Sequence, residues 1–182
     1  MRHLIPILFL VFASLAHSDE AKTVNWPQFR GMGASGIAEG FATPTTWDAP
    51  ASRNLKWKTA IPGLGLSSPV IWGDKVFLTT ATSDRKKDSL KIGLYHEIAP
   101  VEKDGIHHWQ LYCIDKKTGK IIWKQLCHKG VPKGKRHTKS SHANCTPVTD
   151  GRRVVSFFGS EGLYCHDMDG TLLWKKDFGI LD

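Results

Sequence analysis

Hydrophobic, turn-forming and aromatic residues follow the same order in two stretches of the chain. The first stretch contains SSPVIWGDKVFLTTAT and, further along, HWQLYCIDKKTGKIIWK; the second is NCTPVTDGRRVVSFFGSEGLYCHDMDGTLLWKK. Each passes from Pro-Val through a turn with Asp and Gly into a β-rich run. Each then continues through Leu-Tyr-Cys-x-Asp and a glycine turn to two aliphatic residues and a tryptophan. Internal repetition of this kind predicts two copies of one supersecondary unit.

Each copy is predicted to form four short strands. Residues 76–80 and 154–158 are rich in β-branched and aromatic side chains, which suit a pleated, half-buried surface. The two copies end on Trp123 and Trp174, each preceded by two aliphatic residues. No window of a dozen residues shows helical periodicity. The mature chain is therefore expected to be all-β.

Four short segments are predicted to reverse the chain between these strands. They are residues 73–74 and 150–151 after the first strand of each copy, and residues 115–119 and 167–170 after the third. In these turns an aspartate side chain can accept hydrogen bonds from nearby backbone N–H groups, and glycine can adopt the left-handed conformation.

Two longer connections and one isolated segment complete the pattern. Residues 83–107, inside the first copy, and residues 128–144, between the copies, are polar and are expected to be surface excursions. Residues 54–58 (NLKWK) look like a lone fourth strand that would complete the last blade of a closed ring. Two units and one strand are fewer than the four to eight blades of a propeller, so we expect the N-terminal part of a longer chain. Self-assembly of several copies is the alternative.

The glycine turns carry a resemblance to a known repeat. CIDKKTGKIIW (Cys113 to Trp123) resembles the signature of pyrroloquinoline-quinone (PQQ)-type propeller repeats, with Cys113 in place of the usual alanine, and CHDMDGTLLW (Cys165 to Trp174) resembles its shortened form. NWPQFRGMGASG and IPGLGLSSPVIWGDKVFLT are similar to segments of exported, often planctomycete-type, members. The resemblance implies a β-propeller of four-stranded antiparallel blades, here incomplete, with each tryptophan docked between neighbouring blades.

The N-terminus has the features of a secretory signal peptide at residues 1–18. Arg2 is followed by an apolar run and by the Ala16-His17-Ser18 cleavage sequence. The apolar run is too short to span a bilayer comfortably, so no transmembrane anchor is expected. Residues 19–182 are then the N-terminal part of the propeller domain, in a periplasmic or extracellular location. The formal net charge of +8 permits an anionic glycan or lipid surface as partner without requiring one, and no nucleic-acid partner is expected.

Four cysteines in an exported chain allow three disulfide pairings. Cys113 and Cys165 occupy equivalent third-strand positions, where a small buried hydrophobic side chain is the favoured interpretation. Cys127 and Cys145 bracket a basic loop and are the better candidates for a disulfide, whose closure would contribute about 3 kcal/mol.

Histidines suggest a metal site only weakly. His128, His137 and His142 lie in or beside the basic loop, but no carboxylate is near them in sequence and their spacing fits no established ligand pattern. His107 and His108 are no more persuasive, because His108 is expected to begin a strand. Residues 63–68 (GLGLSS) are interpreted as a turn and not as a phosphate-binding loop. No catalytic, cofactor-binding or metal-binding residue is assigned.

Three functions remain open. A non-catalytic scaffold or binding module is favoured, because no catalytic constellation is present. The first alternative is a fragment of a quinone-dependent dehydrogenase, whose PQQ and calcium would bind in a full-length enzyme; the adjacent-cysteine pair of those enzymes is missing from this sequence. The second alternative is a propeller that binds or processes polysaccharide, suggested by the basic surface and the aromatic residues Trp26 and Phe29. We expect these two residues to form a strap across the propeller instead.

Overall fold

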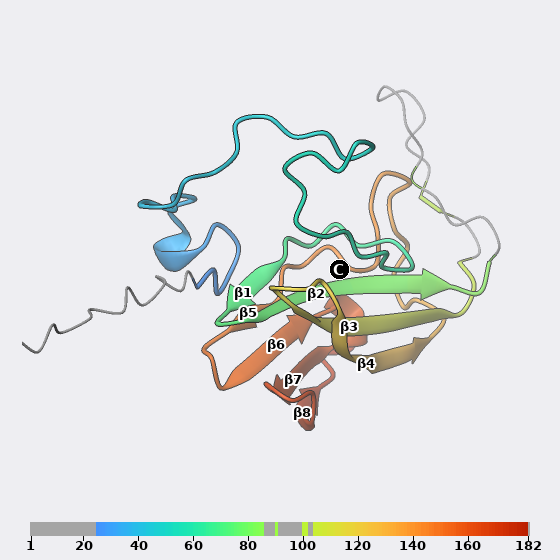
Figure 1. Cartoon of the computed structure of the whole chain (residues 1–182). Helices are drawn as coiled ribbons and strands as arrows, with labels where there is room; N and C mark the ends of the chain where they lie inside the picture. The colour runs from blue at the N-terminus through green and yellow to red at the C-terminus, as the bar shows by residue number, and fades with distance from the viewer. Residues whose placement is uncertain (1–24, 86–89, 91–99, 102–103, 182) are drawn as a thin grey trace, which may run out of the picture.

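The computed structural model describes residues 25–85, 90, 100–101 and 104–181. It contains two four-stranded antiparallel sheets, each a simple meander, in the orders β1-β2-β3-β4 and β5-β6-β7-β8 (Figure 1). The strands are β1 (Val70–Trp72), β2 (Lys75–Ser83), β3 (His107–Asp115), β4 (Ile121–Gly130), β5 (Val148–Thr149), β6 (Arg153–Phe157), β7 (Leu163–Asp167) and β8 (Leu172–Lys176).

The all-β prediction is confirmed. The helices in the described ranges are two single 3-10 turns, η1 (Met32–Ala34) and η2 (Gly159–Glu161). Neither has the length or the apolar content to cross a bilayer. The two sheets do not close into a ring, as expected for an incomplete propeller. The predicted signal peptide, residues 1–18, lies outside the described residues.

The predicted turns form as the sequence indicates. Asp115 Oδ1 accepts hydrogen bonds from the backbone N–H and the hydroxyl of Thr118, both at 2.7 Å, and Asp167 Oδ1 accepts one from Thr171 N at 2.7 Å. These bonds stabilise the ionised carboxylates and lower the pKa of Asp115 and of Asp167. Gly119 has a φ of +74°, which a residue with a Cβ adopts only at a cost in energy.

The strand registers show that the two sheets are copies of each other. In the first sheet one row of directly paired residues runs across all four strands, and the second sheet has its equivalent. The rows are Val70, Phe77, Cys113 and Trp123 in the first sheet, and Val148, Val155, Cys165 and Trp174 in the second. Cys113 and Cys165 are both fully buried, which confirms their interpretation as small core residues.

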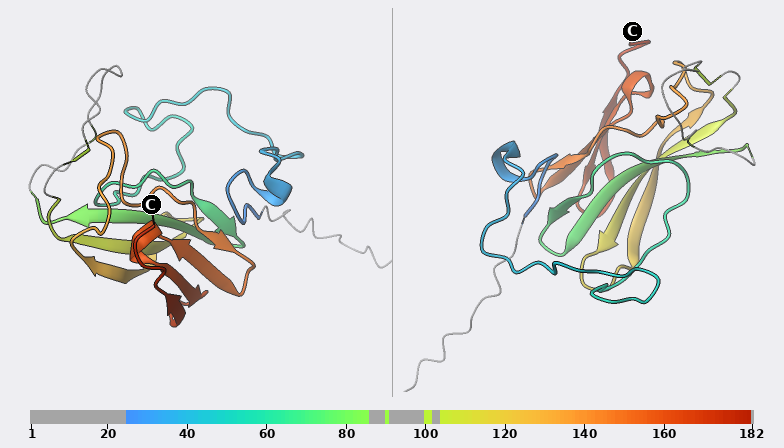
Figure 2. Two further views of the ribbon diagram at one scale, coloured as in Figure 1. Left: turned by 180° about the vertical axis from the view of Figure 1, so that it is seen from behind. Right: turned by 90° about the horizontal axis from the view of Figure 1, so that it is seen from above.

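The hydrophobic core lies between the sheets. Val154 of β6 belongs to the same buried cluster as Val70, Phe77, Leu111 and Cys113 of the first sheet. Strands β1 and β5 are in contact, so the first strands of the two sheets are neighbours (Figures 1 and 2). The sheets thus pack as successive blades, and each depends on its neighbour for burial.

Residues 54–58 differ from the sequence prediction, because they do not form a strand. Residues 55–61 instead alternate between half-buried and exposed positions, as an extended segment does. The described residues contain no sheet for this segment to join, and backbone pairing, not local composition, defines a strand. The 128–144 connection is also shorter than predicted, because β4 continues to Gly130.

A pair of glycine substitutions tests the turn geometry. Gly73 and Gly119 both lie in hairpin turns of the first sheet and have positive φ, but a Cβ at Gly73 would meet no atom within 4 Å, whereas one at Gly119 would lie 2.6 Å from Trp57 Cδ2. We expect Gly73→Ala to cost about 1 kcal/mol of unfolding free energy from backbone strain alone. Gly119→Ala should cost about 2–4 kcal/mol, because the indole must also move.

Urea denaturation of both variants, followed by circular dichroism, measures the difference. Equal losses in the two variants would show that the indole contact adds nothing to stability.

Candidate binding face

A tryptophan ring rests on a glycine turn at two places in the chain. The indole N–H of Trp57 donates to the carbonyl oxygen of Lys116 at 2.8 Å, and that of Trp123 donates to the carbonyl oxygen of Met168 at 3.1 Å. Lys116 lies in the β3–β4 turn and Met168 in the equivalent β7–β8 turn. The same contact therefore recurs one unit apart.

Glycine is required beneath each ring. A Cβ on Gly170 would lie 2.9 Å from Trp123 Cδ2, and one on Gly119 would lie 2.6 Å from Trp57 Cδ2; real Cβ atoms do not approach so closely. A basic side chain strengthens the contact between the sheets, because Lys75 Nζ donates to Met168 O at 2.7 Å and to Asp169 Oδ1 at 3.0 Å. One sheet thus presents an indole and an ammonium group to the next sheet's turn.

Trp174 occupies the position of Trp123 in the second sheet but has a different environment. Its ring is 45% exposed, and Val148 of the same row is 43% exposed. No sheet follows β8 within the described residues to cover them. The two tryptophans are equivalent in register and differ in exposure.

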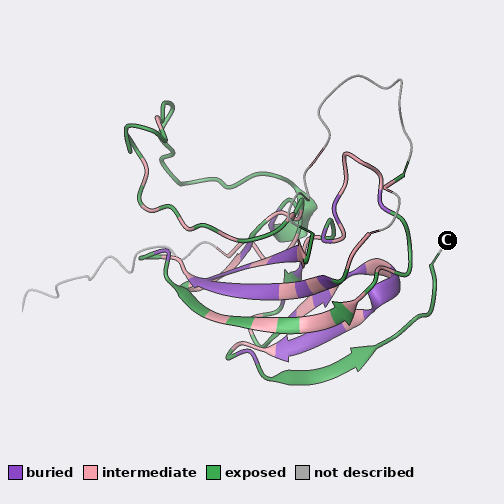
Figure 3. Cartoon of the chain, turned by 90° about the vertical axis from the view of Figure 1, so that its right-hand side faces the viewer, coloured by how far each residue is buried: buried purple, intermediate pink, exposed green. Residues whose placement is uncertain are grey.

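The uncovered row forms a concave apolar face. The concavity has a volume of about 650 Å³, and its lining includes all four residues of the second row: Val148, Val155, Cys165 and Trp174. Asp150 and Arg153 add charged groups to the lining. Strand β8 is exposed over its whole length (Figure 3). We call this surface, lined by the second row with Leu173, Asp150 and Arg153, the open blade face.

One basic residue, Arg153 of β6, contributes to this surface. Arg153 begins β6 as Lys75 begins β2, and each pairs with the aspartate at the end of the third strand, Asp167 or Asp115. Arg153 Nη1 lies 3.9 Å from Asp150 Oδ2, and both side chains are more than half exposed. Arg153 therefore occupies the position in the second sheet that Lys75 occupies in the first. From that position Lys75 contacts the turn of the neighbouring sheet.

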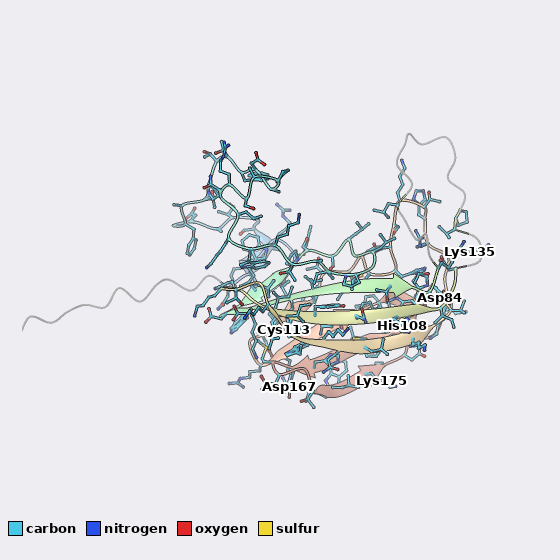
Figure 4. All side chains as sticks on the ribbon, turned by 45° about the vertical axis from the view of Figure 1, so that its right-hand side comes forward. Asp84, His108, Cys113, Lys135, Asp167 and Lys175 are labelled. Carbon is cyan, nitrogen blue, oxygen red and sulfur yellow. The ribbon has the colours of Figure 1, made fainter. Side chains whose placement is uncertain are left out.

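The opposite end of the first sheet brings a different set of residues together. Figure 4 shows Cys113 and Asp167 toward the turn end of the sheets, and His108, Asp84 and Lys135 toward the other end. At that second end the Nε2 atom of His142 lies 2.8 Å from Asp104 Oδ2. The rings of His107 and His142 are 4.8 Å apart and nearly perpendicular.

Of the three histidines considered from the sequence, only His142 belongs to this cluster. His128 lies in β4 with its ring 5.1 Å from that of Trp109, and His137 Nδ1 accepts a hydrogen bond from Lys139 N. The sequence analysis missed Asp104, because it comes from the 83–107 excursion and is distant in sequence from the basic loop. It also set His107 aside.

The cysteine prediction needs a correction, because all four cysteines are free. Cys145 is exposed at the end of the loop, whereas Cys127 lies in β4 and packs against both hydrophobic clusters. Burial raises the pKa of Cys113 and of Cys127 to about 12, so both remain protonated and are weak nucleophiles. Bracketing a loop in sequence does not direct two side chains toward each other.

The described residues do not fit pyrroloquinoline quinone. The cysteines are separate in sequence, and Cys113 and Cys165 are buried in different sheets.

The N-terminal aromatic segment packs as a strap at Trp26. Trp26 exchanges two backbone hydrogen bonds of 2.8 Å with Ile71 of β1, and Pro27 O accepts one from Thr149 N of β5 at 2.9 Å. The segment therefore ties the two sheets together. Phe29 is 58% exposed and is not part of this packing. Residues 63–68 run beside β2, where Leu64 pairs with Ala81.

The repeat geometry agrees with a comparison against known families. Residues 108–179, from β3 to just beyond β8, match the family model described as outer membrane protein assembly factor BamB. Residues 108–179 are therefore similar to a PQQ-like repeat. No curated protein matches it. The matched residues include Trp123 and the turn on which its ring rests.

The two equivalent tryptophans should differ in their contribution to stability. Trp123→Ala removes a ring that packs on Gly170 and Phe77, and we expect a loss of about 3 kcal/mol in unfolding free energy. Trp174→Ala should cost less than about 1 kcal/mol, because its ring lies on an uncovered surface. Urea unfolding monitored by circular dichroism gives both values. Similar losses in both variants would mean that Trp174 is covered in solution.

Proposed function

We propose that this protein is an exported, non-catalytic propeller scaffold whose open blade face binds a further four-stranded blade of the same repeat type. The observation that carries the proposal is the contrast between two equivalent rows. The row of the first sheet is packed against the second sheet, whereas Val148 and Trp174 at the two ends of the second row are nearly half exposed.

The first interface specifies what the docking blade must provide. It needs a turn that offers a backbone carbonyl to the Trp174 indole N–H, with a glycine beneath the ring. It also needs an acidic or carbonyl oxygen for Arg153, as Met168 O and Asp169 provide for Lys75. An aliphatic residue equivalent to Val154 would fill the concavity. These requirements describe the β7–β8 half of a PQQ-like repeat.

A second copy of residues 25–181 is a poor occupant. The turn that it would offer is the β3–β4 turn, and Trp57 already occupies that turn through its bond to Lys116 O. A docking copy would have to displace Trp57 first. The blade that binds over Trp174 must therefore offer a turn that no other tryptophan ring already covers.

Export supports the scaffold role. Residues 1–18 have the sequence features of a cleavable signal peptide, and the matched family description is that of an outer-membrane protein assembly factor. A protein-binding role outside the cytoplasm agrees with both.

Site-specific photo-crosslinking tests the proposal. A p-benzoylphenylalanine replaces Trp174 in the full chain, expressed in cells of the source organism, and the adducts are identified by mass spectrometry. The matched control places the same group at Trp47, which is 73% exposed and outside the open blade face. We expect the adducts at position 174 to contain a partner peptide with a repeat turn of Asp and Gly. We also expect this chain to begin at Asp19 in the exported fraction.

Three outcomes would contradict the proposal. Adducts at position 174 no more frequent than at position 47 would show that nothing docks on the open blade face. Adducts to glycan or lipid would replace the blade with a different partner. Saturable binding of pyrroloquinoline quinone with calcium to the purified chain would favour an enzyme.

A further inference from the structure

We propose that Asp104, His107 and His142 form a binding site for a divalent transition-metal ion, with Zn²⁺ as the best match. Each residue offers one donor atom, and the three donor atoms lie within 4.8 Å of one another. Imidazole and carboxylate ligands suit zinc and its neighbours in the first transition series. This site is separate from the open blade face and does not depend on the blade proposal.

Three different segments bring these residues together. Asp104 lies in the connection that precedes β3, His107 is the first residue of β3, and His142 lies in the connection between β4 and β5. Two of the ligands are held in place. His107 is in register with Ser83 and Gly130, and the backbone carbonyl of His142 accepts a 3.0 Å hydrogen bond from the Trp109 indole.

The protonation of His107 is set by its neighbour. Its Nδ1 atom lies 2.9 Å from the carbonyl oxygen of Gly105. A carbonyl oxygen can only accept, so Nδ1 donates this hydrogen bond, and Nε2 is the ring nitrogen that we assign to the metal ion. This arrangement is the usual one for a metal-binding histidine, whose other ring nitrogen donates to a carbonyl or a carboxylate.

The carboxylate is buried and incompletely satisfied. The side chains of Asp104 and His142 are 7% and 9% exposed, and His107 is 1% exposed. Asp104 Oδ1 has no hydrogen-bond partner in the described part of the chain, which is costly for a buried oxygen. A metal ion would supply the missing interaction. An ion between Asp104 and His142 would replace the 2.8 Å contact between them, with metal–ligand distances of about 2.0–2.2 Å.

Arg136 limits the affinity of this site. Its Nε atom lies 3.9 Å from Asp104 Oδ1, and its side chain is buried. The guanidinium charge opposes a second cation, so we expect weaker binding than at a closed structural site of four cysteines or histidines. His142 and Arg136 also line a concavity of about 290 Å³, which gives solvent ligands access to the open coordination positions.

The site would join two long connections of the fold. Asp104 belongs to the β2–β3 connection and His142 to the β4–β5 connection, and β3 supplies the third ligand from a rigid strand. A bound ion would therefore fix both loops against the first sheet.

Zinc titration of the untagged full chain by calorimetry tests the proposal. We expect one Zn²⁺ per chain and a loss of affinity of at least tenfold in Asp104→Asn and in His107→Gln. His128→Gln is the matched control, because His128 also packs against Trp109 but lies outside the cluster. It should bind zinc as the natural chain does, as should Cys145→Ser, which removes the exposed thiol.

X-ray absorption of the zinc-loaded natural chain gives a second measurement that needs no variant. We expect nitrogen and oxygen scatterers, with two imidazoles and no sulfur. A sulfur scatterer would overturn the assigned ligands, as would unchanged affinity in Asp104→Asn or loss of binding in Cys145→Ser. Absence of stoichiometric binding to the natural chain would overturn the site altogether.

Discussion

The fold depends on the close approach of an indole ring to a glycine turn. The contact has three parts that must coincide: a backbone carbonyl aligned with the indole N–H, a turn without a Cβ, and an aspartate that holds the turn. Trp123 meets all three at the turn that contains Met168 and Gly170. Because hydrogen bonding is directional and apolar burial is not, the carbonyl sets the relative position of two sheets that hydrophobic packing alone would leave free to slide.

This contact also explains where the core lies. Within one four-stranded sheet few residues are buried on both faces. The second sheet accordingly has exposed apolar residues on its open side. Val70, Phe77 and Cys113 of the first sheet are buried, because Val154 and Met168 of the second sheet pack against them. Stability is thus shared between neighbours, as in other repeat proteins, and a single unit has no complete core of its own.

Features encoded by adjacent residues were predictable from the sequence. The strands, the aspartate-glycine turns and the burial of Cys113 follow from local composition and from the repeat. Features that depend on distant pairing were not. Residues 54–58 have the composition of a strand but no sheet to join, and Cys127 faces the hydrophobic clusters and not Cys145. The His142 cluster was missed for the same reason, because its carboxylate comes from another loop.

The two sheets differ in strand length, and this difference divides the first sheet into two regions. Strands β2 and β3 have nine residues each, whereas β6 and β7 have five. The half of the first sheet near the aspartate turns packs against the neighbouring sheet. The repeat therefore constrains the lengths of the strands and turns in this half. The far half, with Trp109, is covered partly by loop residues such as Ala143. Phe158 and Tyr164 of the second repeat belong to the same cluster, so an insertion at that end must leave this contact between the sheets intact.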